Sequence, residues 1–341
     1  MLQIAYIREN QEKVIKALAK RNFDATESIA LVVELDEKRR STQVELDNLL
    51  AESNKLSKEI GELMKAGKKE EAAAIKEQTA DFKETTKNLT EVLNAVTEQL
   101  TQELYKLPNT PSDIAPEGKS ADDNLNVFES GEIPTLHEGA VPHWDLIKKY
   151  DIIDFELGTK ITAPGFPVYK GKGAKLQRAL ISYFLDKNTE AGYNEVQVPH
   201  LINEASGYGT GQLPDKEGQM YHDAKDDLYL IPTAEVPVTN IYRDVILQEN
   251  ELPVTVTGYT PCFRREAGSW GAHVRGLNRL HQFDKVEIVR IEHPEKSYEA
   301  LDGMVEHVKS ILDELKLPYR VLRLCGGDMG FASAITYDFE V

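Results

Sequence analysis

A long stretch without proline, Ile29–Tyr105, constrains the fold more than any other feature of the sequence. Within it, steps of alternately three and four residues connect mainly apolar positions. In the first run these positions are Val32, Leu35, Arg39, Thr42, Leu46, Leu49, Ser53, Leu56, Ile60 and Leu63. A second run keeps the same step through Ala72, Ile75, Thr79, Phe82, Thr86, Leu89, Leu93, Val96 and Leu100. Such spacing is typical of a coiled-coil seam, so the stretch predicts two long helices.

The link between the two predicted helices is short and polar, Lys65–Ala66–Gly67–Lys68–Lys69. A short link leaves two long helices only an antiparallel arrangement. At about 1.5 Å of rise per residue, each helix spans roughly 50 Å. Two helices alone cover little surface, so we expect this hairpin, about residues 29–105, to project into solvent as an arm.

The remaining chain divides around a segment of turn chemistry. Leu107–Asp123 interrupts the helical periodicity with prolines and a glycine, and we interpret residues 107–123 as a linker. Met1–Asp24 predicts a small separate helical piece, which completes an N-terminal domain over residues 1–106. Residues 124–341 then form a second domain.

The second domain mixes helical and strand patterns, which predicts an α+β fold. The helices are expected at Leu176–Ala191, Val236–Ile246 and Ser297–Leu315. The strands are expected at Val254–Phe263, Gln282–Ile291 and Tyr319–Leu324.

Composition narrows the functional classes. A formal net charge of −17 disfavours non-specific nucleic-acid binding, although a local basic patch can still bind RNA. Two cysteines, Cys262 and Cys325, are too few for a disulfide framework or a cysteine zinc site and suit a reducing cytosol. No apolar run approaches membrane-spanning length, and Met1–Asn10 lacks the pattern of a secretory signal. We therefore expect a cytoplasmic protein with no membrane partner.

Two neighbouring strands carry the first candidate site. Val254–Glu266 and Gln282–Ile291 predict an antiparallel pair joined by a glycine-rich loop, Gly268–Gly276, which holds His273 and Arg275 and is long enough to reach over a ligand. Strand alternation places Arg264 and Glu266 on one face of the first strand.

On the second strand, Phe283, Lys285 and Glu287 share a face, and Phe283 and Glu287 lie roughly 13 Å apart. A purine could stack on Phe283, a phosphate could bind the guanidinium of Arg264, and an ammonium group could reach Glu287. From these residues alone, a charged face that is simply exposed to solvent stays open as an alternative to a ligand site.

A second candidate precedes the predicted helix at Val236. Pro237 suits the first turn of a helix, where its missing N–H costs nothing. Glu235 then lies near the positive end of the helix, which favours an ionised carboxylate. A helix-capping role for Glu235 stays open beside a ligand-binding one.

Longer motifs resemble the seryl-tRNA synthetase family of the common bacterial type. The resemblance covers essentially the whole chain, including the hairpin. Its segments are Phe263–Ser269, Arg275–Arg279 and His281–Glu287, which resemble motif 2, with Thr233–Ala234–Glu235, Tyr208–Pro214 and the linker stretch Leu107–Pro111. This resemblance implies a class II catalytic domain, an antiparallel sheet flanked by helices, which dimerises through a motif 1 that includes Gly192–Pro199.

The resemblance also implies a role for each matching residue. Arg264 would hold the α-phosphate of ATP, Glu266 would lie at or near the adenine, and Phe283 would stack on it. Arg265 belongs to the same ATP-binding stretch, and the Leu280 backbone would also contact the nucleotide. Arg279 would orient the acyl phosphate, which makes Arg264, Arg279 and Glu287 the catalytic set. The serine-binding residues would be Thr233, Ala234, Glu235 and Glu287.

The implied reaction activates L-serine with ATP and Mg²⁺ and transfers it to tRNA(Ser), with charging of tRNA(Sec) left open. No metal ligand is predicted on the protein. The hairpin of such enzymes grips the long variable arm of the tRNA, so the candidate contacts are Lys38, Arg39, Arg40, Lys65, Lys68 and Lys69. Simple solvation of a coiled coil stays an alternative for each of these charges.

Two departures and two rival functions complete the prediction. Arg265 stands where the family commonly has a small residue, and the opposite strand face should accommodate it. The chain stops at Thr336–Val341, inside an expected core strand and before motif 3, which predicts a fragment that is inactive or poorly folded by itself. The rivals are a class II relative that loads an amino acid onto a carrier protein and a non-catalytic coiled-coil adaptor that binds nucleotide.

Overall fold

The computed structural model describes residues 2–215, 218–266 and 275–341, and only the backbone of residues 77–81. By its contacts the chain groups into two units. The first combines Met1–Val127 with Leu322–Asp338, and the second combines Phe128–Val321 with Phe339–Val341. The predicted domain boundaries at residues 107–123 stay a prediction.

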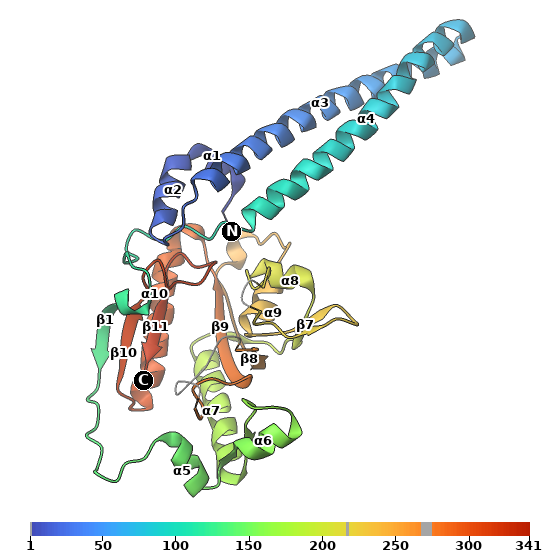
Figure 1. Ribbon diagram of the computed structural model, residues 1–341. Helices are drawn as coiled ribbons and strands as arrows, with labels where there is room; N and C mark the ends of the chain where they lie inside the picture. Colours follow the sequence, from blue (N-terminus) through green and yellow to red (C-terminus); the bar gives the residue numbers. More distant parts are fainter. Residues whose placement is uncertain (1, 216–217, 267–274) are drawn as a thin grey trace. The chain divides into compact units, whose positions relative to one another are not determined.

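The first unit contains the predicted hairpin. Its helices are α1 (Ile4–Glu9), α2 (Gln11–Ala19), α3 (Thr26–Lys65) and α4 (Lys69–Leu104). Helices α3 and α4 run side by side in opposite directions, joined by residues 66–68 (Figure 1). Gly67 adopts a φ of 77°, a conformation that glycine tolerates best, which lets the chain reverse within this short link.

Burial along the hairpin follows the predicted seam. Between Asp47 and Met64 every residue is exposed except the predicted seam positions, which are half-buried and are Leu49, Ser53, Leu56, Ile60 and Leu63. On α4 the seam residues Ala72, Val96 and Leu100 are buried. The side chain of Thr79 lies outside the described residues. The seam prediction is confirmed, because a two-helix contact can cover only one narrow stripe of each helix.

The base of the hairpin belongs to a larger core. Helices α1 and α2 pack against α3 and α4 around buried apolar side chains, which are Ile7, Val14, Leu18, Ala25, Ile29, Val32, Leu35, Val96, Leu100 and Leu107. Each large side chain buried there contributes roughly 1.5–3 kcal/mol. The expectation of a separate N-terminal piece is therefore wrong, because α1 and α2 share one core with the hairpin.

A charged group lies at the edge of this core. Asp36 is 1% exposed and accepts hydrogen bonds from Arg8 at 2.7 Å and from Arg39 at 2.8 Å. Burial would raise the pKa of the Asp36 carboxyl, but the hydrogen bonds and positive charges of the two arginines outweigh it and hold this pKa below its usual value. Arg39 thus serves the helical core, while Lys38 and Arg40 beside it are exposed.

The second unit is built around a long antiparallel strand pair. Strands β8 (Val254–Phe263) and β9 (Gln282–Ile291) have the predicted bounds, and their register runs from Val254 opposite Ile291 to Phe263 opposite Gln282. The short strand β4 (Asn194–Glu195) adds to β8 in parallel, which gives the order β4-β8-β9. The predicted strand pairing is confirmed.

Helices cover both faces of this pair. On one face, α7 (Gly171–Glu190) approaches through Asn188, which donates to Thr257, and Gln177, which donates to Asp284. Helix α9 (Glu235–Asn240) also packs against β8 and β9, and Val238 joins Val198 and Val256 in a buried cluster. Val256 is one residue from Thr257, so alternation puts this cluster on the face opposite α7.

Two helix predictions need correction at their ends. α7 begins at Gly171, five residues before the predicted Leu176, and α9 ends at Asn240 instead of continuing to Ile246. The Asn240 amide donates to the carbonyls of Val236 and Ser206, so this side chain anchors the end of the helix on α8 (Glu204–Gly209). A turn follows in which Asp244 has a φ of 60°, which a continuing α-helix cannot accept.

The other elements complete smaller layers. Helices α5 (His143–Lys149) and α6 (Phe155–Ile161) precede α7, and α10 (Ser297–Glu314) closely matches its prediction. Short strands form a two-stranded sheet, β2-β3, and a three-stranded sheet, β5-β7-β6, from β2 (Ile153–Asp154), β3 (Val168–Tyr169), β5 (Leu201–Ile202), β6 (His222–Asp223) and β7 (Leu228–Leu230).

A further three-stranded sheet has the order β1-β10-β11, from β1 (Leu125–Ser130), β10 (Tyr319–Arg323) and β11 (Tyr337–Glu340). Single turns of 3₁₀-helix lie at η1 (Ala121–Asp123), η2 (Glu249–Glu251) and η4 (Pro294–Lys296). The α+β prediction, with an antiparallel strand pair flanked by helices and preceded by a helical hairpin, is confirmed.

Candidate functional site

The candidate site lies on the face of β8 and β9 that α7 does not cover. Alternation aligns Phe283, Lys285 and Glu287 along this face of β9. Their partners on β8 are Cys262, Thr260 and Gly258 in the same order. At Gly258 an added Cβ would lie 3.0 Å from the Val196 carbonyl oxygen, so the strand passes close under its neighbours there.

One end of this face gathers carboxylates around a buried hydroxyl. Thr233 is 3% exposed, and its Oγ1 donates to Glu287 Oε2 at 3.0 Å. The same Oγ1 accepts from the backbone N–H of Glu235 at 3.2 Å and from Lys285 Nζ at 2.9 Å. Lys285 Nζ also lies 2.7 Å from Glu287 Oε2. The local sequence folds this way because Ile231 accepts the N–H of Phe263, which lays the Pro232–Glu235 segment along β8.

Glu235 opens α9 at this end of the face. Its side chain is exposed, yet surrounding protein atoms displace much of its water, and this desolvation raises its pKa. The negative charge of Glu287 raises the pKa further, whereas Lys285 and Arg264 oppose the shift. Two carboxylates that share one surface in this way attract a positively charged group.

The other end of the face presents an arginine and an aromatic ring. The Arg264 guanidinium lies 5.1 Å from the centre of the Phe283 ring, and its Nε donates to the Pro232 carbonyl at 3.3 Å. Beside them lies a cavity of about 240 Å³, lined by Arg264, Glu266, Leu277, Asn278, Arg279, Leu280 and Phe283. A guanidinium next to an apolar ring suits a ligand that combines a phosphate with a planar base.

A second cavity shares part of that lining. It measures about 330 Å³ and is lined by Gln212, Gln219, Pro232, Arg264, Glu266 and Arg279. Arg279 Nη1 and Glu266 Oε2 are 3.9 Å apart where the two cavities share their walls. Arg264, Glu266 and Arg279 line both cavities, so the two cavities adjoin at the arginine end of the face.

The conformation of Glu266 differs from the prediction. Strand β8 ends at Phe263, and Glu266 has a φ of 48°, in the left-handed region. Glu266 and Arg264 do line the same cavities, but this turn, and not strand alternation, brings them together. Arg265 lines neither cavity: its N–H donates to the Gln219 carbonyl at 2.9 Å, and its guanidinium lies 5.6 Å from the centre of the Tyr221 ring.

His281 supports the backbone of the site from behind. Its carbonyl accepts the N–H of Arg264 at 3.0 Å, and its own N–H donates to Gly165 at 3.0 Å. Its ring shares a hydrogen bond with the Tyr221 hydroxyl at 2.7 Å and stacks on Phe166, with ring centres 5.4 Å apart. These contacts fix the strand ends from which Arg264 and Phe283 project.

The structure brings most predicted site residues together. Thr233, Glu235 and Glu287 meet at one end, and Arg264, Glu266, Arg279, Leu280 and Phe283 meet at the other. Ala234 is buried beside them. In the predicted loop, Gly268–His273 lies outside the described residues, and Arg275 is exposed.

Sequence reasoning assigned no role to several residues of the site. Lys285 contacts both Thr233 and Glu287, and its position midway between Phe283 and Glu287 in the strand alternation could have revealed it. Gln212, Gln219 and Asn278 line the cavities through loops, where no periodic signal exists to find them.

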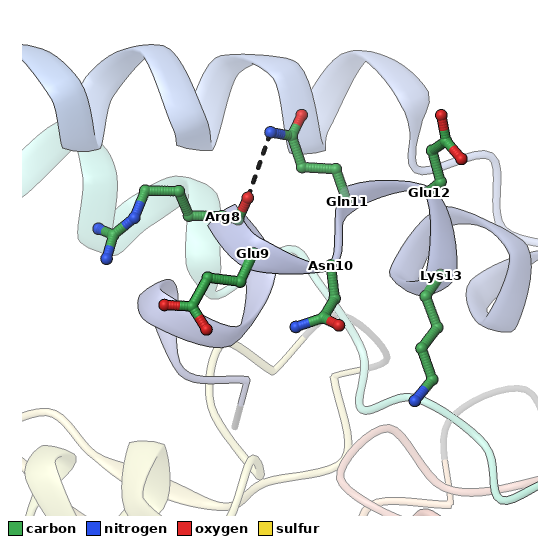
Figure 2. A pocket seen from close by; sticks show the side chains of 6 residues that line it. All are labelled: Arg8, Glu9, Asn10, Gln11, Glu12 and Lys13. Carbon is green, nitrogen blue, oxygen red and sulfur yellow. Dashed lines mark hydrogen bonds between the residues drawn. The ribbon is translucent and has the colours of Figure 1, made fainter.

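The first unit has a depression of its own, at the junction of α1 and α2 (Figure 2). It measures about 510 Å³ and is lined by the consecutive residues Arg8 to Lys13, which carry both signs of charge. Arg8 is already paired with Asp36, and Gln11 donates to the Arg8 carbonyl at 3.4 Å. These polar groups serve the helix junction, so we do not interpret this depression as a ligand site.

Among the described residues, none of the helices combines the length and the apolar character that crossing a membrane requires.

Comparisons with known protein families cover both parts of the chain. The model for the seryl-tRNA synthetase N-terminal domain matches residues 1–111. The model for the tRNA synthetase class II core domain (G, H, P, S and T) matches residues 219–341, which include the whole candidate site except Gln212.

Individual relatives agree with these matches. The serine–tRNA ligase of Salinibacter ruber is 47% identical over 341 residues, which are 100% of this chain and 80% of the relative. The serine–tRNA ligase of a Hydrogenobaculum species is 46% identical, with the same shares covered. Among solved structures, that of seryl-tRNA synthetase from Pyrococcus horikoshii complexed with ATP matches with a TM-score of 0.89 at 30% identity, covering 100% of this chain and 80% of that one.

Proposed function

The chain belongs to the seryl-tRNA synthetase family, whose members are serine–tRNA ligases, and on this premise we propose that the face from Phe283 to Glu287 forms seryl-adenylate from L-serine and ATP. The observation that carries the proposal is the opposition of two ends on one strand face. One end offers carboxylates and a hydroxyl, and the other offers a guanidinium and an aromatic ring.

We assign the nucleotide to the cavities around Arg264. Adenine would stack on Phe283 beside Glu266 and the Leu280 backbone, and the α-phosphate would bind Arg264. Arg279 is exposed at the shared wall of the cavities, where it could hold the acyl phosphate. We keep Arg265 with the ATP-binding stretch in a lesser role, because its guanidinium lies over Tyr221.

We assign L-serine to the opposite end. Its ammonium group would lie against Glu287, Glu235 and Thr233, with Ala234 shaping the floor. A positive charge there relieves the repulsion between Glu235 and Glu287 that, after desolvation, adds to the raised pKa of Glu235. The two carboxylates therefore favour a ligand with an ammonium group. The proposal that this ligand is serine rests on the relatives.

The proposed first step is an in-line transfer. A serine carboxylate oxygen forms a bond to the α-phosphorus of ATP, while the bond from that phosphorus to the bridging oxygen breaks and pyrophosphate leaves with the electron pair. Arg264 and Arg279 would stabilise the charge that develops on the phosphoryl oxygens. No protein nucleophile takes part. Burial raises the pKa of the Cys262 thiol beside Phe283, so the thiol stays protonated and unreactive.

In the second step, a terminal hydroxyl of tRNA(Ser) would attack the serine carbonyl carbon of the adenylate, and AMP would leave. Mg²⁺ enters such reactions bound to the phosphates of ATP, as part of the substrate. In residues 2–215, 218–266 and 275–341, no group of three or more His, Cys, Asp or Glu side chains could hold a metal ion.

We further propose that the hairpin binds tRNA(Ser), that two copies associate through Gly192–Pro199, and that the protein is cytoplasmic. Lys38, Arg40, Lys65 and Lys69 are exposed on the hairpin, and in the motif 1 segment Asn194, Glu195 and Gln197 are exposed while Tyr193 and Val198 are buried. Charging of tRNA(Sec) stays open. The carrier-protein and adaptor alternatives are not favoured, because both synthetase domain models match.

Separate binding of the two ligands tests the proposal. Calorimetric titration of the 341-residue chain should show that Glu287→Ala weakens L-serine about 100-fold, the loss expected from charge-assisted hydrogen bonds, with ATP affinity within about threefold. Phe283→Ala should weaken ATP by about tenfold through lost stacking and leave serine within about threefold.

Glu292→Ala is the matched control, because Glu292 is also a paired, largely buried carboxylate next to β9, held by Arg290 at 2.6 Å. It should change neither affinity. Serine binding by Glu287→Ala at the unaltered strength would contradict the assignment of the ammonium end.

A further inference from the structure

A lysine of this chain occupies the acceptors that a substrate ammonium group would need. Lys285 Nζ lies 2.7 Å from Glu287 Oε2 and donates to Thr233 Oγ1 at 2.9 Å. Glu287 and Thr233 are also the groups that the proposed function gives to the ammonium of the amino acid. A second ammonium placed on the same oxygens would lie within a few ångströms of Lys285, where like charges repel strongly.

The Lys285 side chain is more exposed than the groups that it contacts. Its side chain is 36% exposed, whereas Glu287 is 18% exposed and Thr233 is 3% exposed. A lysine carries its charge on a flexible four-carbon stem, so it can exchange partners without moving the strand. Arg264, the nearby alternative cation, is held by the Pro232 carbonyl and lies over the Phe283 ring at the other end of the face.

Resting on the proposed function, we propose that Lys285 selects for a free α-carboxylate by exchanging partners. The substrate's ammonium takes the place of the Lys285 ammonium on Glu287 and Thr233, and Lys285 turns to the substrate's carboxylate. An α-amino acid brings both charges, so the number of ion pairs is kept. An amine without a carboxylate displaces Lys285 and gives it no new partner, so the site rejects it.

The exchange predicts opposite effects of one substitution on two ligands. The ligands are L-serine and L-serinamide, which keeps the ammonium but lacks the carboxylate, both titrated into the 341-residue chain at about pH 6.5, where the amino groups are largely protonated. Lys285→Met should weaken L-serine about tenfold through the lost carboxylate contact. The same substitution should tighten L-serinamide at least about threefold, because its competitor for Glu287 is gone.

Lys187→Met is the matched control. Lys187 lies on α7, its side chain is 30% exposed, and it pairs with Glu314 at 2.8 Å, so it loses a comparable ion pair away from the site. It should leave both affinities unchanged. Thermal unfolding shows whether each variant is folded. If Lys285→Met does not fold, Lys285→Gln takes its place, with the same expected outcomes.

The results distinguish a failure of the exchange from a failure of the proposed function. Opposite shifts for the two ligands support the exchange. Equal weakening of both ligands assigns Lys285 a merely structural role and overturns it, as does an unchanged affinity for L-serine. Failure of the unaltered chain to bind L-serine while it still binds ATP contradicts the proposed function itself, and the exchange with it.

Discussion

The hairpin and the strand face organise their side chains in different ways. Along α3 and α4 one rule repeats, so each seam residue meets the same kind of neighbour as the one before it. On the strand face each contact occurs once: Thr233 donates to Glu287, and Arg264 covers Phe283. A repeated contact can be weakened at one position with a small loss, whereas a contact made once has no substitute. The two regions should therefore respond very differently to single substitutions.

The largest effect is expected at Arg264. Arg264→Ala removes the guanidinium that the proposal places on the α-phosphate, so serine-dependent exchange of pyrophosphate into ATP should fall about 10³-fold. The exchange rate of the variant is compared with that of its parent, and both are made in a form of the protein that catalyses the exchange. Unfolding temperature should hardly change, because the Arg264 side chain donates to a backbone carbonyl and otherwise lines the two cavities.

Arg265→Ala is the neighbouring comparison. Its guanidinium lies over Tyr221 and lines neither cavity, so the same measurement should show a loss below about tenfold. Equal losses for both arginines would break the distinction between them and place Arg265 at the phosphate too.

The same contrast explains what the sequence could predict. The hairpin and its seam follow from spacing alone, because a repeated pattern carries its structure locally. Strands β8 and β9 were also predicted with their bounds, since both stretches are rich in β-branched and aromatic residues. The Lys285 contacts and the left-handed turn at Glu266 depend on residues far apart in the chain, and no local pattern encodes them.

A core leucine gives the next largest effect. Leu18 is fully buried in the core at the base of the hairpin, so Leu18→Ala should lower the free energy of unfolding by about 3 kcal/mol. Leu56 is a half-buried seam residue in the middle of α3, and Leu56→Ala should cost about 1 kcal/mol. Chemical denaturation followed by circular dichroism measures both. If Leu56→Ala lowered the free energy of unfolding as much as Leu18→Ala, the hairpin would not be a series of repeated contacts that each contribute little.

The buried carboxylate of Asp36 gives a smaller, pH-dependent effect. The pKa of Asp36 is lowered in the folded chain, so its ion pairs stabilise the fold fully above the unfolded pKa of about 3.9. This contribution is lost as the pH falls from there through the lower, folded pKa. Asp36→Asn should lower the free energy of unfolding by about 2 kcal/mol at pH 7, and by progressively less as the pH falls below about 4.

Denaturation of the parent and Asp36→Asn at several pH values measures the difference. A stability gap that stays constant down to the lowest pH would contradict the assigned role of the charge. Asp47→Asn is the matched control, because Asp47 is an exposed carboxylate on the same helix.

The smallest effect per residue is expected on the exposed cations of the hairpin. Lys38 and Arg40 flank Arg39, which is held by Asp36, so only the outer two are placed to meet phosphates. Lys38→Ala and Arg40→Ala should each weaken binding of tRNA(Ser) by less than about tenfold and lower the slope of log affinity against log salt by about one. Filter binding across a salt series measures this slope. Lys55→Ala, at another exposed position of α3, tests whether the effect belongs to the residues beside Arg39 or to any lysine of the helix. An unchanged slope in both variants would remove this part of the hairpin from the tRNA interface, and equal changes at all three positions would mean that the helix binds through its repeated charge, as its repeated seam binds α4.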